Sequence, residues 1–186
     1  MISANNTTSS LDSEMFITDD YWQLIRYNYE QIRHAELKAS LIVSLYSIFF
    51  TIAYTFDILD EENIYSFDSS SPLIYLKIAT VIPPIIFTIL SFSSCVNCFL
   101  PRLKISVKPS PLFFGDIKPN WGKFSDYSKE LINVMDNDKE YKIHLSQMAY
   151  VTGSIADQKF KYVSKSIRHL SKSVVFFLLF FITILI

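Results

Sequence analysis

The stretch Asn137–Ile186 reads NDKEYKIHLSQMAYVTGSIADQKFKYVSKSIRHLSKSVVFFLLFFITILI, and no proline interrupts it. It opens with a capping-box pattern, in which the Asn137 side chain can accept from the backbone N–H of Glu140 while the Glu140 side chain reaches back. A polar, basic segment at helical spacing then leads directly into a wholly apolar end. The stretch therefore predicts one helix that begins in water and ends in lipid, and such a helix can couple a cytosolic event to a membrane.

The composition favours an all-helical membrane protein. Half of the 186 residues are hydrophobic, and the mean hydropathy is +0.25, which is unusual for a soluble domain. Glycine is scarce, at 3 residues, which disfavours a turn-rich sheet protein. Cys95 and Cys98 are too few for a disulfide scaffold and lack the partners of a zinc site, so we expect buried thiols. The polar start of the chain does not resemble a cleavable signal peptide.

Three apolar runs are long enough to cross a bilayer. Residues 39–56 carry no charge, and residues 73–100 form a second span that contains Pro83 and Pro84. The third run, 170–186, is about 17 residues long, which is the lower limit for a span. The proline pair predicts a kink, either as a packing feature or as a gating hinge.

The basic residues predict the orientation. The acidic loop 57–71 contains no Lys or Arg, whereas the N-terminal segment and the 101–172 region are rich in both. By the positive-inside rule, the N-terminus and the 101–172 region lie in the cytosol, and the C-terminus lies outside.

These patterns predict an all-α membrane protein with three transmembrane helices. Its cytosolic helical domain is formed by extensions of the first and third spans plus the segment between spans two and three. In that segment we expect an irregular stretch over 102–123 and a short helix over Phe124–Met135 that is capped by Ser125. The predicted parts are a disordered N-terminus 1–18, a cytosolic helix 19–38, spans at 39–56, 73–100 and 170–186, an external loop 57–72 and a cytosolic region 101–169.

The sequence contains no catalytic or metal-binding constellation. His34, His144 and His169 are scattered without metal-ligand spacing, and no P-loop, nucleophile elbow or Rossmann glycine pattern occurs. We therefore expect a protein that is not an enzyme and that needs no cofactor.

One acid-free segment between residues 159 and 172 carries five basic residues with interleaved aromatic residues. Basic side chains neutralise phosphates, and aromatic rings stack on bases. The alternative is that the same charges attract anionic lipid headgroups and set the topology. The candidate ligand-binding residues are Lys159, Lys161, Lys165, Arg168, Arg102 and Tyr162.

Two sets of small residues sit at helical spacing. The pair Ala149 and Gly153 predicts close helix packing or an oligomer seam, because an interior glycine costs up to about 1 kcal/mol of helix stability relative to alanine. The second set shares one face of the first span, where it indicates helix–helix packing or the lining of a pore. This second set consists of Ser40, Ser44, Ser47 and Thr51.

Five segments occur in an order typical of one family: HAELKAS (34–40), Pro101-Arg102, LFFG (112–115), SDYSKEL (125–131) and QMAYVTGSIADQKF (147–160). The first is similar to an A-D-x-K-A motif, with Glu36 in place of the aspartate. The last is similar to a Q-x-x-x-x-x-x-I-A-x-x-K-[FY] run that precedes a closing span. Together they resemble the Pycsar effector transmembrane family over roughly residues 22–186, and the polar segment 1–18 has no counterpart there.

The resemblance implies a bacterial antiphage effector that answers a nucleotide signal made by a partner cyclase or nucleotidyltransferase. On that basis we expect a homo-oligomer of the inner membrane, with a tetramer as the working stoichiometry. A cyclic nucleotide or a short oligonucleotide would bind its cytosolic helices and control an ion channel or other membrane disruption, leading to depolarisation and growth arrest. The alternative is a non-conducting membrane scaffold that docks a cytosolic partner protein.

Overall fold

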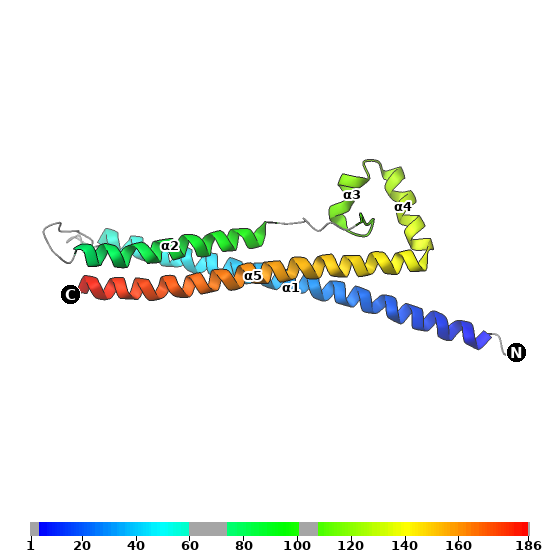
Figure 1. Cartoon of the computed structure of the whole chain (residues 1–186), viewed down its shortest axis with the longest axis horizontal. Coiled ribbons are helices and arrows are strands. Elements are labelled where there is room, and N and C mark those ends of the chain that lie inside the picture. Colours follow the sequence, from blue (N-terminus) through cyan, green and yellow to red (C-terminus); the bar gives the residue numbers. More distant parts are fainter. Residues whose placement is uncertain (1–3, 60–73, 101–107, 186) are drawn as a thin grey trace. The chain divides into compact units, whose positions relative to one another are not determined.

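The computed structural model describes residues 4–59, 74–100 and 108–185 (Figure 1). Within these ranges the chain forms helices and no strand, so the predicted all-helical fold class is confirmed. The helices are α1 (Ala4–Leu59), α2 (Ile74–Phe99), α3 (Phe114–Asn120), α4 (Phe124–Asp136) and α5 (Asp138–Leu185).

Three of these helices, α1, α2 and α5, are long and apolar enough to cross a membrane, which confirms the three predicted spans. The 48 residues of α5 extend about 70 Å, more than twice the roughly 30 Å of a hydrocarbon core. The last charged residue of α5 is Lys172, so only the C-terminal part of this helix can lie in hydrocarbon. The cytosolic location of the polar part stays a prediction.

The N-terminus of α5 forms as its sequence predicts. The backbone N–H of Glu140 donates to Asn137 Oδ1 over 3.3 Å, which is the forward half of the capping box. Lys142 Nζ lies 2.7 Å from Asp138 Oδ2, one helical turn away. Asp138 and Glu140 in the first turn also interact favourably with the helix dipole.

Three local predictions differ from the structure. Helix α1 begins at Ala4, so most of the predicted disordered segment 1–18 is helical. No proline or glycine interrupts that segment, and extending an existing helix is far easier than starting one. The short helix α3 interrupts the stretch 102–123 that was expected to be irregular. The N-cap of α4 is Lys123 rather than Ser125, whose hydroxyl donates instead to Asp126 over 3.3 Å.

The chain divides into two compact units. Unit 1 combines Met1–Arg33 with Arg102–Asp157, and unit 2 combines His34–Pro101 with Gln158–Ile186. Helices α1 and α5 therefore each contribute residues to both units, whereas α2 belongs only to unit 2 and α3 and α4 only to unit 1.

Unit 2 is a three-helix bundle, in which α2 lies alongside the C-terminal part of α5 (Figure 1). Small side chains fill much of its centre, and this allows the helix backbones to approach closely. Cys95 and Cys98 are free thiols with no exposed surface, so the prediction of buried thiols is confirmed. The buried core consists of Ala35, Ala39, Ile42 and Tyr46 from α1, Cys95 and Cys98 from α2, and Val163 from α5.

Unit 1 has its own core, where the first part of α5 packs against α1 and against Phe113, which precedes α3. At the edge of this core, the Trp22 indole N–H donates to the Tyr141 hydroxyl over 3.2 Å. The buried residues are Ile25 from α1, Phe113, and Leu145, Met148, Ala149 and Val151 from α5.

Candidate functional site

A partly buried ion pair links α1 and α5 in unit 2. Lys159 is only 7% exposed, and its ammonium lies 2.7 Å from Glu36 Oε1. The same ammonium donates to the backbone carbonyl of Cys98 over 2.6 Å. Hydrogen bonds with an ionised donor are short and strong, and they offset the cost of removing the charge from water. One side chain thus holds all three helices of the bundle together.

Hydroxyl groups extend this polar contact along the seam between α2 and α5. The Ser91 and Ser166 hydroxyls lie 2.9 Å apart, and each also donates to the other residue's backbone carbonyl over 3.0 Å. Cys95 Sγ lies 3.0 Å from the Ser166 hydroxyl. In lipid, every buried polar group must find a protein partner, and these groups find theirs on the neighbouring helix.

The seam continues toward the end of α5. The Ser173 hydroxyl lies 2.7 Å from that of Thr88 and donates to the Pro84 carbonyl over 3.2 Å. Helix α2 runs through its two prolines, so its Pro84 takes part in helix packing, while a hinge there stays a prediction. Further along, the hydroxyls of Thr80 and Thr183 lie 3.3 Å apart.

The sequence contained a signal for this seam that motif analysis missed. Lys159, Ser166 and Ser173 recur every seven residues, as do Ser91 and Cys98 on α2. A seven-residue repeat of small or polar residues keeps one face of a helix turned toward its partner. Of the residues in the seam, only Lys159, Pro84 and the two cysteines were singled out from the sequence.

The predicted basic ligand-binding residues separate into two groups. Lys161, Lys165 and Arg168 are exposed, and their spacing of four and three residues places them on one face of α5. Lys159 is buried and held by Glu36, so it does not join that exposed face. The assignment of these four residues to a ligand site stays a prediction.

The other two predicted ligand residues lie elsewhere. Tyr162 is half-buried and packs against the core of unit 2, and Arg102 lies outside the described residues. Among the described residues, no group of three or more His, Cys, Asp or Glu side chains could hold a metal ion.

The four hydroxyl residues predicted to pack or to line a pore are exposed on α1. Three of the hydroxyls bond to their own helix: those of Ser40, Ser47 and Thr51 donate to the carbonyls of Glu36, Val43 and Ser47. The complete set is Ser40, Ser44, Ser47 and Thr51. They lie apart from the buried face of α1 that forms the core of unit 2, so neither role that the sequence suggested for them is tested.

In unit 1, the Ala149–Gly153 pair lies at a helix–helix contact. Asn28 of α1 is buried there, and its amide donates to the Ala149 carbonyl over 2.9 Å and to the Thr152 hydroxyl over 3.1 Å. A Cβ at Gly153 would lie 3.3 Å from Asn28 Nδ2, which is a tight contact. The small residues therefore allow α1 to approach α5 within one chain.

A second polar cluster in unit 1 centres on His144, which is 1% exposed. Its Nδ1 lies 3.0 Å from the Ser110 hydroxyl, and the Ser110 backbone N–H donates to the Asp116 carboxylate over 2.9 Å. Burial lowers the pKa of His144, and the positive charge of Lys108 lowers it further. A neutral imidazole thus fixes the segment that precedes α3 onto α5.

Comparison with known proteins agrees with the motifs. A family model described as the Pycsar effector protein domain matches residues 20–186, which is nearly the whole chain. No match is found among curated proteins or among solved structures. The chain therefore belongs to the Pycsar effector family, and it is a transmembrane effector in antiphage defence.

Proposed function

We propose that the chain is a homo-oligomeric, non-enzymatic effector that disrupts or depolarises the bacterial inner membrane under the control of a nucleotide ligand. The observation that carries this proposal is the Glu36–Lys159 pair, because it joins α1 and α5, the two helices that also contribute to unit 1. A ligand that prefers one packing of α1 against α5 would shift the population of their arrangements in unit 2.

The proposed ligand is a cyclic nucleotide or a short oligonucleotide made by a partner cyclase or nucleotidyltransferase. The exposed face of Lys161, Lys165 and Arg168 can neutralise its phosphates. The half-buried ring of Tyr162 lies next to these residues in the sequence and offers an aromatic face to a base. Lys159 supports the coupling rather than the binding, since its ammonium already bonds to Glu36 and Cys98.

The way the bundle is filled supports the proposed homo-oligomer. Tyr46, Cys95 and Cys98 occupy the centre of unit 2, so an ion path would form between copies and not within one copy. The exposed hydroxyl face that includes Ser44 and Ser47 is available for such contacts. A tetramer remains the working stoichiometry.

The test is dye and ion leakage from vesicles that contain the purified chain. Vesicles of phosphatidylethanolamine and phosphatidylglycerol would be loaded with a small dye and exposed to each 3′,5′-cyclic mononucleotide and to short oligoadenylates. We expect one class of ligand to change the leakage rate. A Lys161→Gln/Lys165→Gln/Arg168→Gln variant should insert normally and lose that response.

Two outcomes would contradict the proposal. If the triple variant responds as the original chain does, the exposed basic face is not the ligand site. If vesicles stay tight with every ligand while the chain still arrests growth without loss of membrane potential, the chain acts as a scaffold for a cytosolic partner protein.

A further inference from the structure

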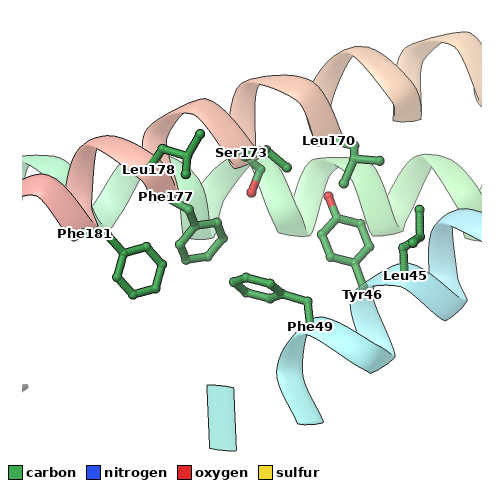
Figure 2. Close-up of a pocket in the computed structure, with 9 residues that line it drawn as sticks. Leu45, Tyr46, Phe49, Leu170, Ser173, Phe177, Leu178 and Phe181 are labelled. Carbon is green, nitrogen blue, oxygen red and sulfur yellow. The ribbon is translucent and has the colours of Figure 1, made fainter. Parts of the chain in front are cut away.

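An apolar groove of about 330 Å³ lies between α1 and α5 in unit 2. Figure 2 shows Tyr46 and Phe49 of α1 facing Leu170 and Phe177 of α5 across it. Apart from Tyr46 and Ser173, all its lining side chains are pure hydrocarbon. Its volume falls at the lower end of small-molecule sites, which span roughly 300–1,000 Å³.

The position of the groove determines what can fill it. Its lining residues belong to the apolar parts of two membrane-spanning helices, so acyl chains surround it. Leu45 and Leu178 at its rim are 56% and 59% exposed, so the groove is open to that medium. Helices gain no hydrophobic drive from association within lipid, and an unfilled groove would forfeit dispersion contacts along both walls. A chain inserted from the bilayer would restore these contacts.

The open surface of the groove is almost wholly apolar. The Tyr46 hydroxyl is buried behind its wall, close to the Ser173 hydroxyl, which is itself engaged by Thr88 and Pro84. An occupant therefore meets hydrocarbon along the groove, which fits an acyl chain.

A cation is present on the same face of α1. Lys38 precedes Leu45 by seven residues, which is two helical turns or about 10 Å along the axis. Its side chain is exposed, and its ammonium lies 5.2 Å from the centre of the Phe160 ring. Within the described part of the chain, Lys38 forms no ion pair. A flexible ammonium at this distance from a hydrocarbon groove matches the phosphate of a lipid whose acyl chain lies in the groove.

We propose that this groove binds one acyl chain of an anionic phospholipid from the surrounding bilayer, with the phosphate at Lys38. The site would make the lipid a structural part of the α1–α5 contact. Because the claim concerns lipid and not nucleotide or conductance, it stands independently of the proposed function.

The experiment is native mass spectrometry of the full-length chain in detergent, titrated with phosphatidylglycerol or with phosphatidylcholine of the same acyl chains. Two adjacent valines give a matched pair of variants. Val174 lines the groove and is 48% exposed, while Val175 does not line it and is 55% exposed. We expect Val174→Trp to abolish binding of the tightest lipid and Val175→Trp to leave it unchanged.

Headgroup specificity is tested at Lys38. Lys38→Gln should reduce the preference for phosphatidylglycerol over phosphatidylcholine about fivefold, because one interfacial lysine contributes roughly 1 kcal/mol to anionic lipid binding. Lys139→Gln, an exposed lysine at the start of α5, serves as the control and should not change it. Glycerol 3-phosphate, which has the headgroup charge and no chain, should not bind.

Folding of the tryptophan variants is checked by helix content and by a single peak in gel filtration, and Val174→Phe replaces Val174→Trp if the latter aggregates. Equal lipid binding by the position-174 and position-175 variants would overturn the proposal. A change in the number of subunits at position 174 without loss of lipid would also overturn it, since a second copy of the chain would then be the occupant.

Discussion

Lys159 and Glu36 form an ion pair whose two partners differ in their contact with solvent. The lysine side chain is 9% exposed and the glutamate side chain is 41% exposed. Removing Glu36 therefore leaves a buried, unpaired ammonium. Removing Lys159 leaves a carboxylate that water can reach. A charge left buried and unpaired is strongly destabilising, whereas a carboxylate that water reaches loses little when its partner is removed.

The first prediction is an asymmetry in stability at this pair. Glu36→Gln should lower the free energy of unfolding by about 1.5–3 kcal/mol, the usual contribution of a hydrogen bond to a charged group. Lys159→Met should cost less, because methionine fills similar space and leaves Glu36 open to water. Unfolding titrations in micelles measure both. A larger loss for Lys159→Met would show that the lysine is not buried as described.

The sequence allowed the helices and spans to be predicted because lipid imposes a simple rule. A segment that crosses hydrocarbon must be long, apolar and helical, and such segments are visible from composition alone. The burial of the Lys159 side chain against another helix could not be predicted in this way. Within a run of basic residues, only the partner on another helix distinguishes it from Lys161, and Glu36 lies far away in sequence.

The second prediction concerns the contact between Asn28 and Gly153. Alanine in a helix interior is about 1 kcal/mol more favourable than glycine, but here its Cβ would crowd the Asn28 amide at 3.3 Å. Gly153→Ala should therefore have little net effect alone and should stabilise the chain by about 1 kcal/mol in an Asn28→Ala background. A double-mutant cycle of unfolding free energies measures the coupling.

Gly122 provides the control for this cycle, since a Cβ there would have no atom within 4 Å. Gly122→Ala should show no coupling to Asn28→Ala. Coupling of the same size at both glycines would mean that Asn28 acts through the unfolded chain rather than through contact with α5.

The third prediction is a loss of stability in unit 1 at acid pH. The folded pKa of His144 is lowered from its ordinary value of about 6.5, chiefly by burial and next by the charge of Lys108, although Glu140 and Glu130 oppose this shift. Below about pH 6.5 the unfolded chain therefore binds more protons than the folded chain, so the free energy of unfolding decreases as pH falls. The contribution of His144 is complete above this pH and disappears as pH falls through its folded pKa.

Hydrogen exchange of residues 108–116, corrected for the intrinsic effect of pH on exchange, should report this loss first, because Ser110 joins that segment to His144. His144→Gln should flatten the pH dependence, whereas His34→Gln, at an exposed position, should retain it. Identical profiles for the two variants would assign the acid sensitivity to another group.

The fourth prediction tests the exposed hydroxyl face of α1. Ser44 is exposed, whereas Ile42, two residues earlier, is 5% exposed and belongs to the core of unit 2. If copies of the chain meet at the hydroxyl face, Ser44→Cys should form disulfide-linked dimers in membranes after mild oxidation, and Ile42→Cys should not. The native thiols of Cys95 and Cys98 are fully buried and provide a low background. Dimers formed equally by both variants would rule out a contact specific to this face.

The packing of α2 on α5 could not be predicted from the sequence. Serine is common on the exposed faces of helices and in helix contacts, so one serine alone indicates neither. The seven-residue interval between Ser166 and Ser173 indicates that both serines lie on one face of α5. That this face contacts α2 becomes clear only from the structure, where Ser91 and Thr88 lie opposite these serines. Pairing of this kind depends on the relative register of two helices, which no segment of sequence specifies alone.

The fifth prediction tests that register at Ser166, which has no exposed surface and contacts Ser91 and Cys95. Ser166→Ala should lower the free energy of unfolding by only about 0.6 kcal/mol, the average for a hydrogen bond between membrane helices. Ser166→Leu must push α2 away and should cost about 1–3 kcal/mol through overpacking. Ser171→Leu is the control, because Ser171 is exposed and its hydroxyl bonds only to its own helix at Ile167. If leucine were tolerated equally at both positions, α2 would not pack against α5 in the register described.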